Sequence, residues 1–231
     1  MALKRLNKFL SECGIASRRK SEDLIASNII SINNVVANKP QTLLDPDRDV
    51  VKLNNQVISP EKKYYFILNK PKKFICSNTR KGKEYLVIDL FKDYSAKLFT
   101  VGRLDKDTTG LIIITNDGDF ANKVIHPSSN LEKEYIAKVK EGITDEHLKK
   151  ISKGAFVENK YVRPLKVVKM RRGTIKIITK EGRKREVRAF IEKANLTIAE
   201  LTRVRIGNLS LGSLPYGYYK QVTLKDLEEI F

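Results

Sequence analysis

A short polar segment divides this chain into two parts with different patterns. Ser59 and Pro60, followed by the charged run at residues 61–63, separate two series of short apolar segments. Proline and clustered polar residues between periodic segments are typical of a linker. The length of 231 residues allows two folded parts. The sequence therefore predicts two domains, residues 1–60 and residues 63–231.

The first part has the pattern of two helices and a small sheet. Apolar residues recur at helical spacing from Leu3 to Leu10, and Gly14 follows as a helix end. Ser17 is a typical N-cap for a second helix over residues 18–27. Short β-branched segments with Asn–Asn turns predict antiparallel strands at residues 29–32, 35–36 and 50–53.

The second part mixes strands and helices without regular alternation. Strands are predicted at residues 64–68, 111–115, 134–139, 167–170, 174–179, 204–206 and 209–211. Helices are predicted at residues 120–124, 145–153, 187–194 and 226–231. This order favours an α+β fold over a doubly wound parallel sheet.

The charge of the chain indicates a polyanionic partner. Lys and Arg number 45 against 27 Asp and Glu, and the formal net charge of +18 divides into +3 for residues 1–62 and +15 for residues 63–231. Such a field attracts nucleic acid or an acidic membrane face. No apolar stretch approaches the roughly 18–20 residues that span a bilayer, and polar residues interrupt the start of the chain. Nucleic acid is therefore the expected partner, and no membrane.

Cysteine and histidine spacing predicts neither a metal site nor a disulfide framework. Cys13 and Cys76 stand far apart, and His126 and His147 lack ligand spacing. This pattern fits a reducing cytoplasm. The chain also has no P-loop and no dinucleotide fingerprint, so we expect no cofactor.

Two clusters of polar residues are candidates for function. Arg18, Arg19 and Lys20 open a predicted helix, where charge and free backbone N–H groups both attract phosphate; a solvated basic surface is the alternative. Asp105 stands on a loop before an apolar strand, with Arg103 nearby, where a reactive carboxylate is usefully held. The alternative is an Asp that serves only a turn.

The first part resembles a known RNA-binding module. "RLNKFLSECGIASRRKSEDLI", "ISINNVV" and "DPDRDVVKLNNQVI" are similar to the alpha-L RNA-binding module over residues 4–58. Asn33–Asn34 replaces the Asn–Gly turn common in that module, and Asn also tolerates a positive φ. The resemblance implies contacts with the RNA backbone from Arg5, Ser17, Arg18, Arg19 and Lys20.

The second part resembles an enzyme family. "NKPKKFIC", "VGRLDKDTTGLIIITNDG", "EKEYIAKV" and "EGRKREVR", followed by "ELTRVRIGNLSLGSLPYGYYKQVT", occur in the order found in the RsuA-type family of ribosomal RNA pseudouridine synthases. The match runs over residues 64–224. Lys73 stands where the family usually has Gly, which puts the local loop geometry in question, and Ala189–Phe190 replaces a more usual Arg–Met pair.

The resemblance implies a chemistry and its residues. Such an enzyme breaks the N1–C1′ bond of a flipped-out uridine and joins C5 to C1′, on a mixed, mainly antiparallel sheet with flanking helices. It implies Asp105 as the essential carboxylate, acting as nucleophile or base, with Arg188 paired to it and Arg103 entering the space that the base leaves. Tyr135 stacks on the uracil, or is an interior strand residue, and Leu201 packs nearby or is only structural. Contacts with the RNA backbone, or solvated charge, are expected of Lys70, Arg183, Lys184 and Arg185.

The expected partner is ribosomal RNA or a ribosomal subunit precursor, bound by a monomer. The compact length and the "SRRKSEDLI" segment favour large-subunit RNA over small-subunit RNA. The target uridine stays open, as does the choice between naked RNA and an assembling particle. One alternative is a non-catalytic RNA-binding assembly factor on a synthase scaffold, and another is a nuclease or glycosylase that acts on RNA.

Overall fold

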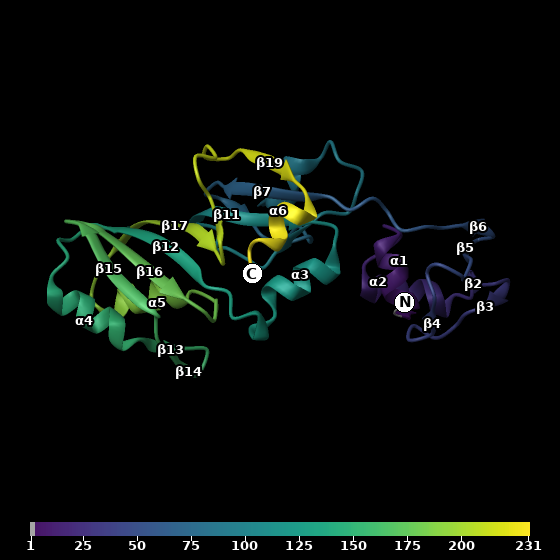
Figure 1. Cartoon of the computed structure of the whole chain (residues 1–231), viewed down its shortest axis with the longest axis horizontal. Coiled ribbons are helices and arrows are strands. Elements are labelled where there is room, and N and C mark those ends of the chain that lie inside the picture. The colour runs from purple at the N-terminus through teal and green to yellow at the C-terminus, as the bar shows by residue number, and fades with distance from the viewer. Residues whose placement is uncertain (1–2) are drawn as a thin grey trace. The chain divides into compact units, whose positions relative to one another are not determined.

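The computed structural model describes residues 3–231, which form two compact units (Figure 1). The first unit comprises the chain up to Lys63 together with Ser95–Lys97 and Asn116–Gly118. The second comprises Tyr64–Tyr94, Leu98–Thr115 and Asp119–Phe231.

The first unit packs two helices against short strands. Its elements are β1 (Lys4–Arg5), α1 (Leu6–Glu12), α2 (Arg18–Ala26), β2 (Ile30–Ile32), β3 (Val35–Val36), β4 (Leu43–Leu44), β5 (Val51–Leu53) and β6 (Gln56–Val57). Four strands form an antiparallel sheet in the order β3-β2-β5-β6. Both Asn–Asn turns have positive φ at each residue, as a tight hairpin requires. Leu6, Leu10, Ile25 and Ile30 fill the core of this unit.

The second unit is built on one large sheet in the order β15-β16-β12-β17-β11-β7-β19, with β10 beside β11 and β18 beside β17. The strands are β7 (Tyr65–Lys70), β10 (Phe99–Val101), β11 (Thr108–Thr115), β12 (Lys133–Val139), β15 (Lys166–Arg171), β16 (Thr174–Thr179), β17 (Ile198–Ile206), β18 (Leu209–Ser210) and β19 (Tyr219–Val222). Every pairing is antiparallel except that of β11 with β17. The fold is thus α+β with a mainly antiparallel sheet, which confirms the prediction.

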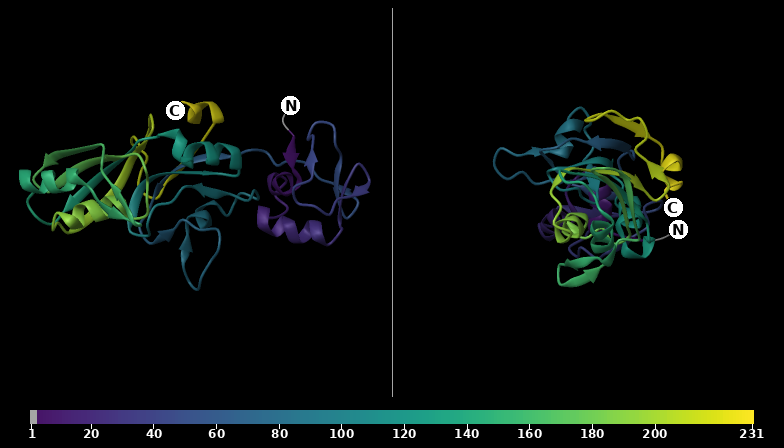
Figure 2. Two further views of the ribbon diagram at one scale, coloured as in Figure 1. Left: turned by 90° about the horizontal axis from the view of Figure 1, so that it is seen from below. Right: turned by 90° about the vertical axis from the view of Figure 1, so that its left-hand side faces the viewer.

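Helices cover the sheet at two places (Figures 1 and 2). The helices α3 (Gly118–Ile125) and α6 (Leu224–Glu228) pack on β7 and β11 through Phe120, Val124 and Leu227. The helix α4 (Asp145–Lys153) contacts β15, and α5 (Glu186–Lys193) contacts β17. Every residue of β7 and β11 is buried, as expected for strands at the centre of a covered sheet.

Besides the strands β10 and β19, three small features of the second unit have no counterpart in the sequence predictions. A parallel pair joins β8 (Phe74–Ile75) to β9 (Tyr85–Leu86), and the 3-10 helices η1 (Val87–Phe91) and η2 (Pro127–Ser129) lie in connections. A hairpin of β13 (Ala155–Val157) and β14 (Lys160–Val162) follows α4. These elements are short, and two or three residues carry too little periodicity to predict a strand.

Candidate active site

Asp105 lies on the loop between β10 and β11, and the side chain of Lys70 anchors that loop. The Lys70 side chain is fully buried, and its Nζ donates to the carbonyl oxygens of Thr108 at 2.9 Å, Pro71 at 3.0 Å and Lys106 at 3.3 Å. An ammonium has three protons, so all three find acceptors. Burial lowers the pKa of Lys70, against the nearby Cys76, Asp107 and Asp105, which raise it.

The prediction that Lys70 contacts the RNA backbone is therefore wrong. A side chain that is 0% exposed cannot reach a phosphate. The sequence shows a lysine beside a proline and gives no sign that its strand is covered on both faces. What Lys70 does is fix the carbonyl groups of Lys106 and Thr108, which follow Asp105 in its loop.

Lys73 keeps the loop geometry that glycine would give. Its φ of 73° lies in the left-handed region, and its N–H donates to the carbonyl of Lys106 at 2.9 Å. Nearby, the N–H of Leu104 donates to Sγ of Cys76 at 3.4 Å. The segment after β7 thus supports the Asp105 loop at two further points.

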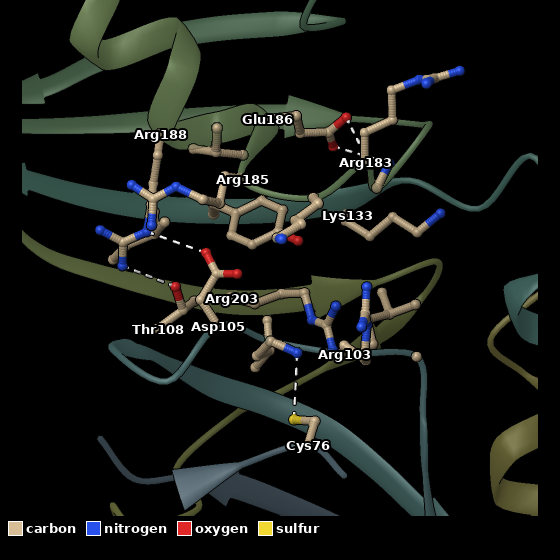
Figure 3. Close-up of a pocket in the computed structure, with 18 of the residues that line it drawn as sticks. Cys76, Arg103, Asp105, Thr108, Lys133, Arg183, Arg185, Glu186, Arg188 and Arg203 are labelled. Carbon is tan, nitrogen blue, oxygen red and sulfur yellow. Dashed lines mark hydrogen bonds and ion pairs between the residues drawn. The ribbon is translucent and has the colours of Figure 1, made fainter. Parts of the chain in front are cut away.

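The carboxylate of Asp105 contacts the guanidinium of Arg188. Nε of Arg188, on α5, lies 3.3 Å from Oδ2 of Asp105, and Nη2 donates to Oγ1 of Thr108 at 3.1 Å. The dashed lines in Figure 3 mark both contacts. The Asp105 side chain is 31% exposed and that of Arg188 is 13% exposed. The carboxylate is therefore held on one side and open to a ligand on the other.

The floor of the pocket comes from the central strands β12 and β17. Tyr135 and Leu201 are buried there, and both line the pocket. Burial raises the pKa of the Tyr135 phenol, while Arg203 lowers it by its charge and a hydrogen bond. Gly110 lets β11 approach β17, because a Cβ at that position would lie 2.2 Å from the Arg203 carbonyl oxygen.

Arg203 is a buried cation on this floor. It is 5% exposed, and its Nε donates to the carbonyl of Leu111 at 2.9 Å. Its Nη2 has no hydrogen-bond partner among residues 3–231. A buried, unsatisfied donor costs free energy unless a ligand supplies an acceptor. Arg203 thus adds a positive charge to the floor of the pocket.

The basic loop before α5 is shaped by Glu186. The buried carboxylate accepts from the N–H of Gly182 at 2.9 Å and of Arg183 at 3.1 Å. Burial raises the pKa of Glu186, against its hydrogen bonds and the nearby Lys133. Arg185 has a φ of 59° and precedes the helix. Arg183, Lys184 and Arg185 are consequently presented at the rim of the pocket.

One pocket of about 410 Å³ collects most of the predicted site residues. It is lined by Arg103, Asp105, Tyr135, Arg183, Lys184, Arg185, Arg188 and Leu201. Sequence reasoning missed Thr108, Lys133, Glu186 and Arg203, which also line it. In β17, the side chains of Leu201 and Arg203 are both buried and lie on the same face of the strand. Strand alternation would therefore have placed Arg203 beside Leu201, but only if the bounds of β17 had been predicted.

The other predicted cluster lies in the first unit. Ser17 caps α2 by accepting from the N–H of Lys20 at 3.4 Å, as predicted. Arg18, Arg19 and Lys20 are exposed on the first turn of that helix, and Arg5 is exposed immediately before α1. The arrangement suits phosphate groups that approach the helix start.

Among residues 3–231, no group of three or more His, Cys, Asp or Glu side chains is placed to hold a metal ion. Within the same range, no helix is long and apolar enough to cross a membrane.

Comparisons with known proteins agree with this geometry. A family model described as RNA pseudouridylate synthase matches residues 64–193, and one described as S4 domain matches residues 4–50. A putative chloroplast ribosomal large subunit pseudouridine synthase of Arabidopsis thaliana is 44% identical over 97% of this chain, which spans 59% of that longer relative. The ribosomal large subunit pseudouridine synthase B of Bacillus subtilis is 32% identical, over 99% of this chain and 96% of its own.

A solved structure gives the same result for the fold. The crystal structure of a pseudouridylate synthase superposes with a TM-score of 0.70 at 26% identity, and the match covers 98% of this chain and 99% of the other.

Proposed function

Because the chain belongs to the RNA pseudouridylate synthase family and carries an S4 domain, we propose that it isomerises a specific uridine to pseudouridine in ribosomal RNA. Large-subunit RNA is the proposed substrate. The names of the Arabidopsis and Bacillus relatives support that choice, since both refer to the large ribosomal subunit. The proposal includes a monomer that needs no cofactor.

The pairing of Asp105 with Arg188 carries the proposal. The reaction needs a carboxylate beside C1′ of the target nucleotide, and the Arg188 guanidinium lies 3.3 Å from that of Asp105. Arg188 also fixes the direction of the carboxylate, because its second arm is held by Thr108. Two roles fit this arrangement: attack on C1′, or removal of a proton.

The floor of the pocket suits a flipped uracil. Tyr135 offers an aromatic face, and base stacking on such a ring contributes roughly 1–3 kcal/mol. Arg203 adds a positive charge to the same floor. The reaction only rearranges the base: the N1–C1′ bond breaks, C5 joins C1′, C5 loses its proton and N1 gains one. We assign the stacking role to Tyr135, packing beside the base to Leu201, and entry into the vacated space to Arg103.

Binding of the RNA backbone is assigned to two basic surfaces. One is the rim loop with Arg183, Lys184 and Arg185, and the other is the start of α2 with Arg18, Arg19 and Lys20. We propose domain boundaries at residues 1–60 and 63–231, so that each surface belongs to one domain. The two cysteines are buried and unpaired, which supports a reducing, cytoplasmic location.

Pseudouridine mapping tests the proposal. Both ribosomal RNAs are mapped by carbodiimide-blocked primer extension in cells with the gene, without it, and with Asp105→Asn. We expect one stop, in large-subunit RNA, that disappears in both altered strains. A stop that survives Asp105→Asn would refute the role of Asp105. Unchanged maps in the deletion strain would favour the assembly-factor alternative.

A further inference from the structure

The hairpin of β13 and β14 presents two aromatic rings to solvent. Phe156 is 75% exposed and Tyr161 is 38% exposed. The two residues are direct cross-strand partners, and their ring centroids lie 5.0 Å apart in an edge-to-face arrangement. The opposite face of the hairpin, with Ala155, Val157 and Val162, is buried. The hairpin is thus attached through its small aliphatic residues, and its aromatic face is left uncovered.

The backbone holds these rings in place. Glu158 and Asn159 both have positive φ, which gives a tight two-residue turn. At the other end, Gly154 has a φ of 82°, and a Cβ there would lie 2.0 Å from the carbonyl oxygen of Val162. The phenol of Tyr161 donates to the carbonyl of Lys153 at 2.6 Å. A platform that is already rigid loses little entropy when it binds.

Two cations lie beside Tyr161. Nζ of Lys193 lies 5.4 Å from the centroid of the Tyr161 ring, and Cζ of Arg163 lies 5.5 Å from it. Next to Tyr161 is an open depression of about 470 Å³, lined by Leu148, Lys149, Ser152, Lys153 and Arg163. This lining has three cations and no acidic residue. Aromatic faces beside a basic groove are the features that bind single-stranded nucleic acid.

The hairpin tip is connected to the rim of the active-site pocket. Nζ of Lys160 lies 3.4 Å from Oε1 of Glu181, and Glu181 also pairs with Arg183 at 2.7 Å. Glu181 and Arg183 both line the pocket that contains Asp105. Figure 1 shows the hairpin beside α5, the helix that carries Arg188, and it projects from the lower edge of the unit there and in the right-hand view of Figure 2.

From these observations we propose that Phe156 and Tyr161 form a stacking platform for an unpaired base of the substrate RNA, close in sequence to the target uridine. The depression lined by Lys149, Lys153 and Arg163 binds the phosphates of the same strand. This inference rests on the proposed function, because it takes RNA as the substrate. It adds a binding site for a flanking nucleotide that is separate from the uracil pocket.

Binding of defined RNA probes tests the platform without any turnover. The full chain is titrated into a fluorescein-labelled 12-nucleotide oligouridylate and into a labelled 12-base-pair RNA duplex, at one fixed salt concentration, and anisotropy gives both Kd values. Phe156→Leu removes the ring and keeps an apolar side chain. We expect it to weaken binding of the oligouridylate about 5- to 50-fold, with less than a twofold change for the duplex. Phe156→Tyr keeps the ring and is expected to bind like the wild type.

Tyr218→Leu is the matched control, since Tyr218 is 66% exposed and lies before β19, away from the hairpin. Thermal unfolding checks that each variant folds. An unchanged Kd for Phe156→Leu, an equal loss for the duplex, or the same loss for Tyr218→Leu would each overturn the platform.

The platform and the proposed function fail in distinguishable ways. If the wild type shows no synthase activity while Phe156→Leu still loses binding of the oligouridylate, the platform stands and the function does not. If ribosomal RNA is modified and Phe156→Leu binds the oligouridylate like the wild type, only the platform fails.

Discussion

Nε of Arg188 lies 3.3 Å from Oδ2 of Asp105, although the two residues are 83 positions apart in the chain. The guanidinium also reaches Oγ1 of Thr108, which is on the strand that follows the Asp105 loop. The helix α5 and the strand β11 are thereby joined at the carboxylate. A small shift of either element would change the direction of Asp105, so we expect Asp105, Thr108 and Arg188 to act together.

Arg188→Lys should lower kcat while the protein still folds. A lysine keeps the charge but cannot hold Asp105 and Thr108 together, because it lacks the planar fork of a guanidinium. We expect kcat to fall by roughly 10- to 100-fold, since charge-assisted contacts of this kind contribute about 1.5–3 kcal/mol, with little change in KM. Thr108→Ser, which keeps the hydroxyl, is the matched control. A wild-type kcat in Arg188→Lys would argue that Asp105, Thr108 and Arg188 do not act together.

Tyr135 is expected to act through its ring more than through its hydroxyl. Tyr135→Leu should reduce kcat/KM by about 10- to 100-fold, because stacking contributes roughly 1–3 kcal/mol. Tyr135→Phe keeps the ring and loses only the hydrogen bond with Arg203, so its reduction in kcat/KM should be smaller. Steady-state rates on ribosomal RNA transcripts measure both. Equal losses in the two variants would show that the hydroxyl, not the ring, is what matters.

Lys70→Met should destabilise the fold. The substitution removes the side-chain donor shared by the carbonyls of Pro71, Lys106 and Thr108, of which Lys106 keeps the N–H of Lys73. We expect the free energy of unfolding to fall by about 2–4 kcal/mol, measured by urea denaturation. Activity should fall too, because the carbonyls next to Asp105 are no longer fixed. Unchanged stability would contradict the anchoring role.

The same variant tests the charge of Lys70. Burial holds the pKa of Lys70 below 10.5 in the folded protein. Between that lowered pKa and 10.5 the unfolded chain binds more protons, so this group's contribution to stability rises with pH in that window. The contribution is complete above 10.5 and is lost as pH falls through the folded-state pKa. The free energy of unfolding of the wild type should rise relative to that of Lys70→Met as pH rises through this window. If the two free energies change in parallel with pH, Lys70 does not contribute in this way.

The basic surfaces should control the salt dependence of RNA binding. Each phosphate contact adds roughly 0.7 to 0.9 to the slope of log K against log salt. Replacing Arg183, Lys184 and Arg185 together by Ala should flatten the slope by about 2, and replacing Arg18, Arg19 and Lys20 should do the same. Lys220→Ala and Lys225→Ala, near the C-terminus, serve as charge controls. An unchanged slope in a triple variant would remove that surface from the binding site.

Local signals predicted much of the fold. Ser17 and the charged residues after it located α2, and the α4 helix was predicted at its observed bounds, because capping residues and helical periodicity are local properties. The ordered motifs also indicated Asp105, Tyr135, Arg188 and Leu201, which line one pocket although they are far apart in the chain. Such motifs identify these residues through resemblance to a family, which composition and periodicity cannot do.

What the sequence could not predict depends on tertiary burial. Lys70 looked like a surface cation, and only the covering of β7 on both faces shows it to be an anchor for the Asp105 loop. Arg203 looked like one of many basic residues until β17 placed it on the pocket floor. The hairpin of Phe156 and Tyr161 is too short for a periodic signal, and its exposed rings become visible only when its other face is buried.

Release of tritium from RNA tests the central claim most directly. Joining C5 of uracil to C1′ displaces the hydrogen at C5, so large-subunit RNA transcribed with uridine tritiated at C5 releases tritium to water only when the new bond forms. With excess enzyme we expect the wild type to release close to one equivalent per RNA, and Asp105→Asn to release none while its Kd for the RNA stays within about threefold of the wild type. Tritium release by Asp105→Asn at a rate near that of the wild type would contradict the account.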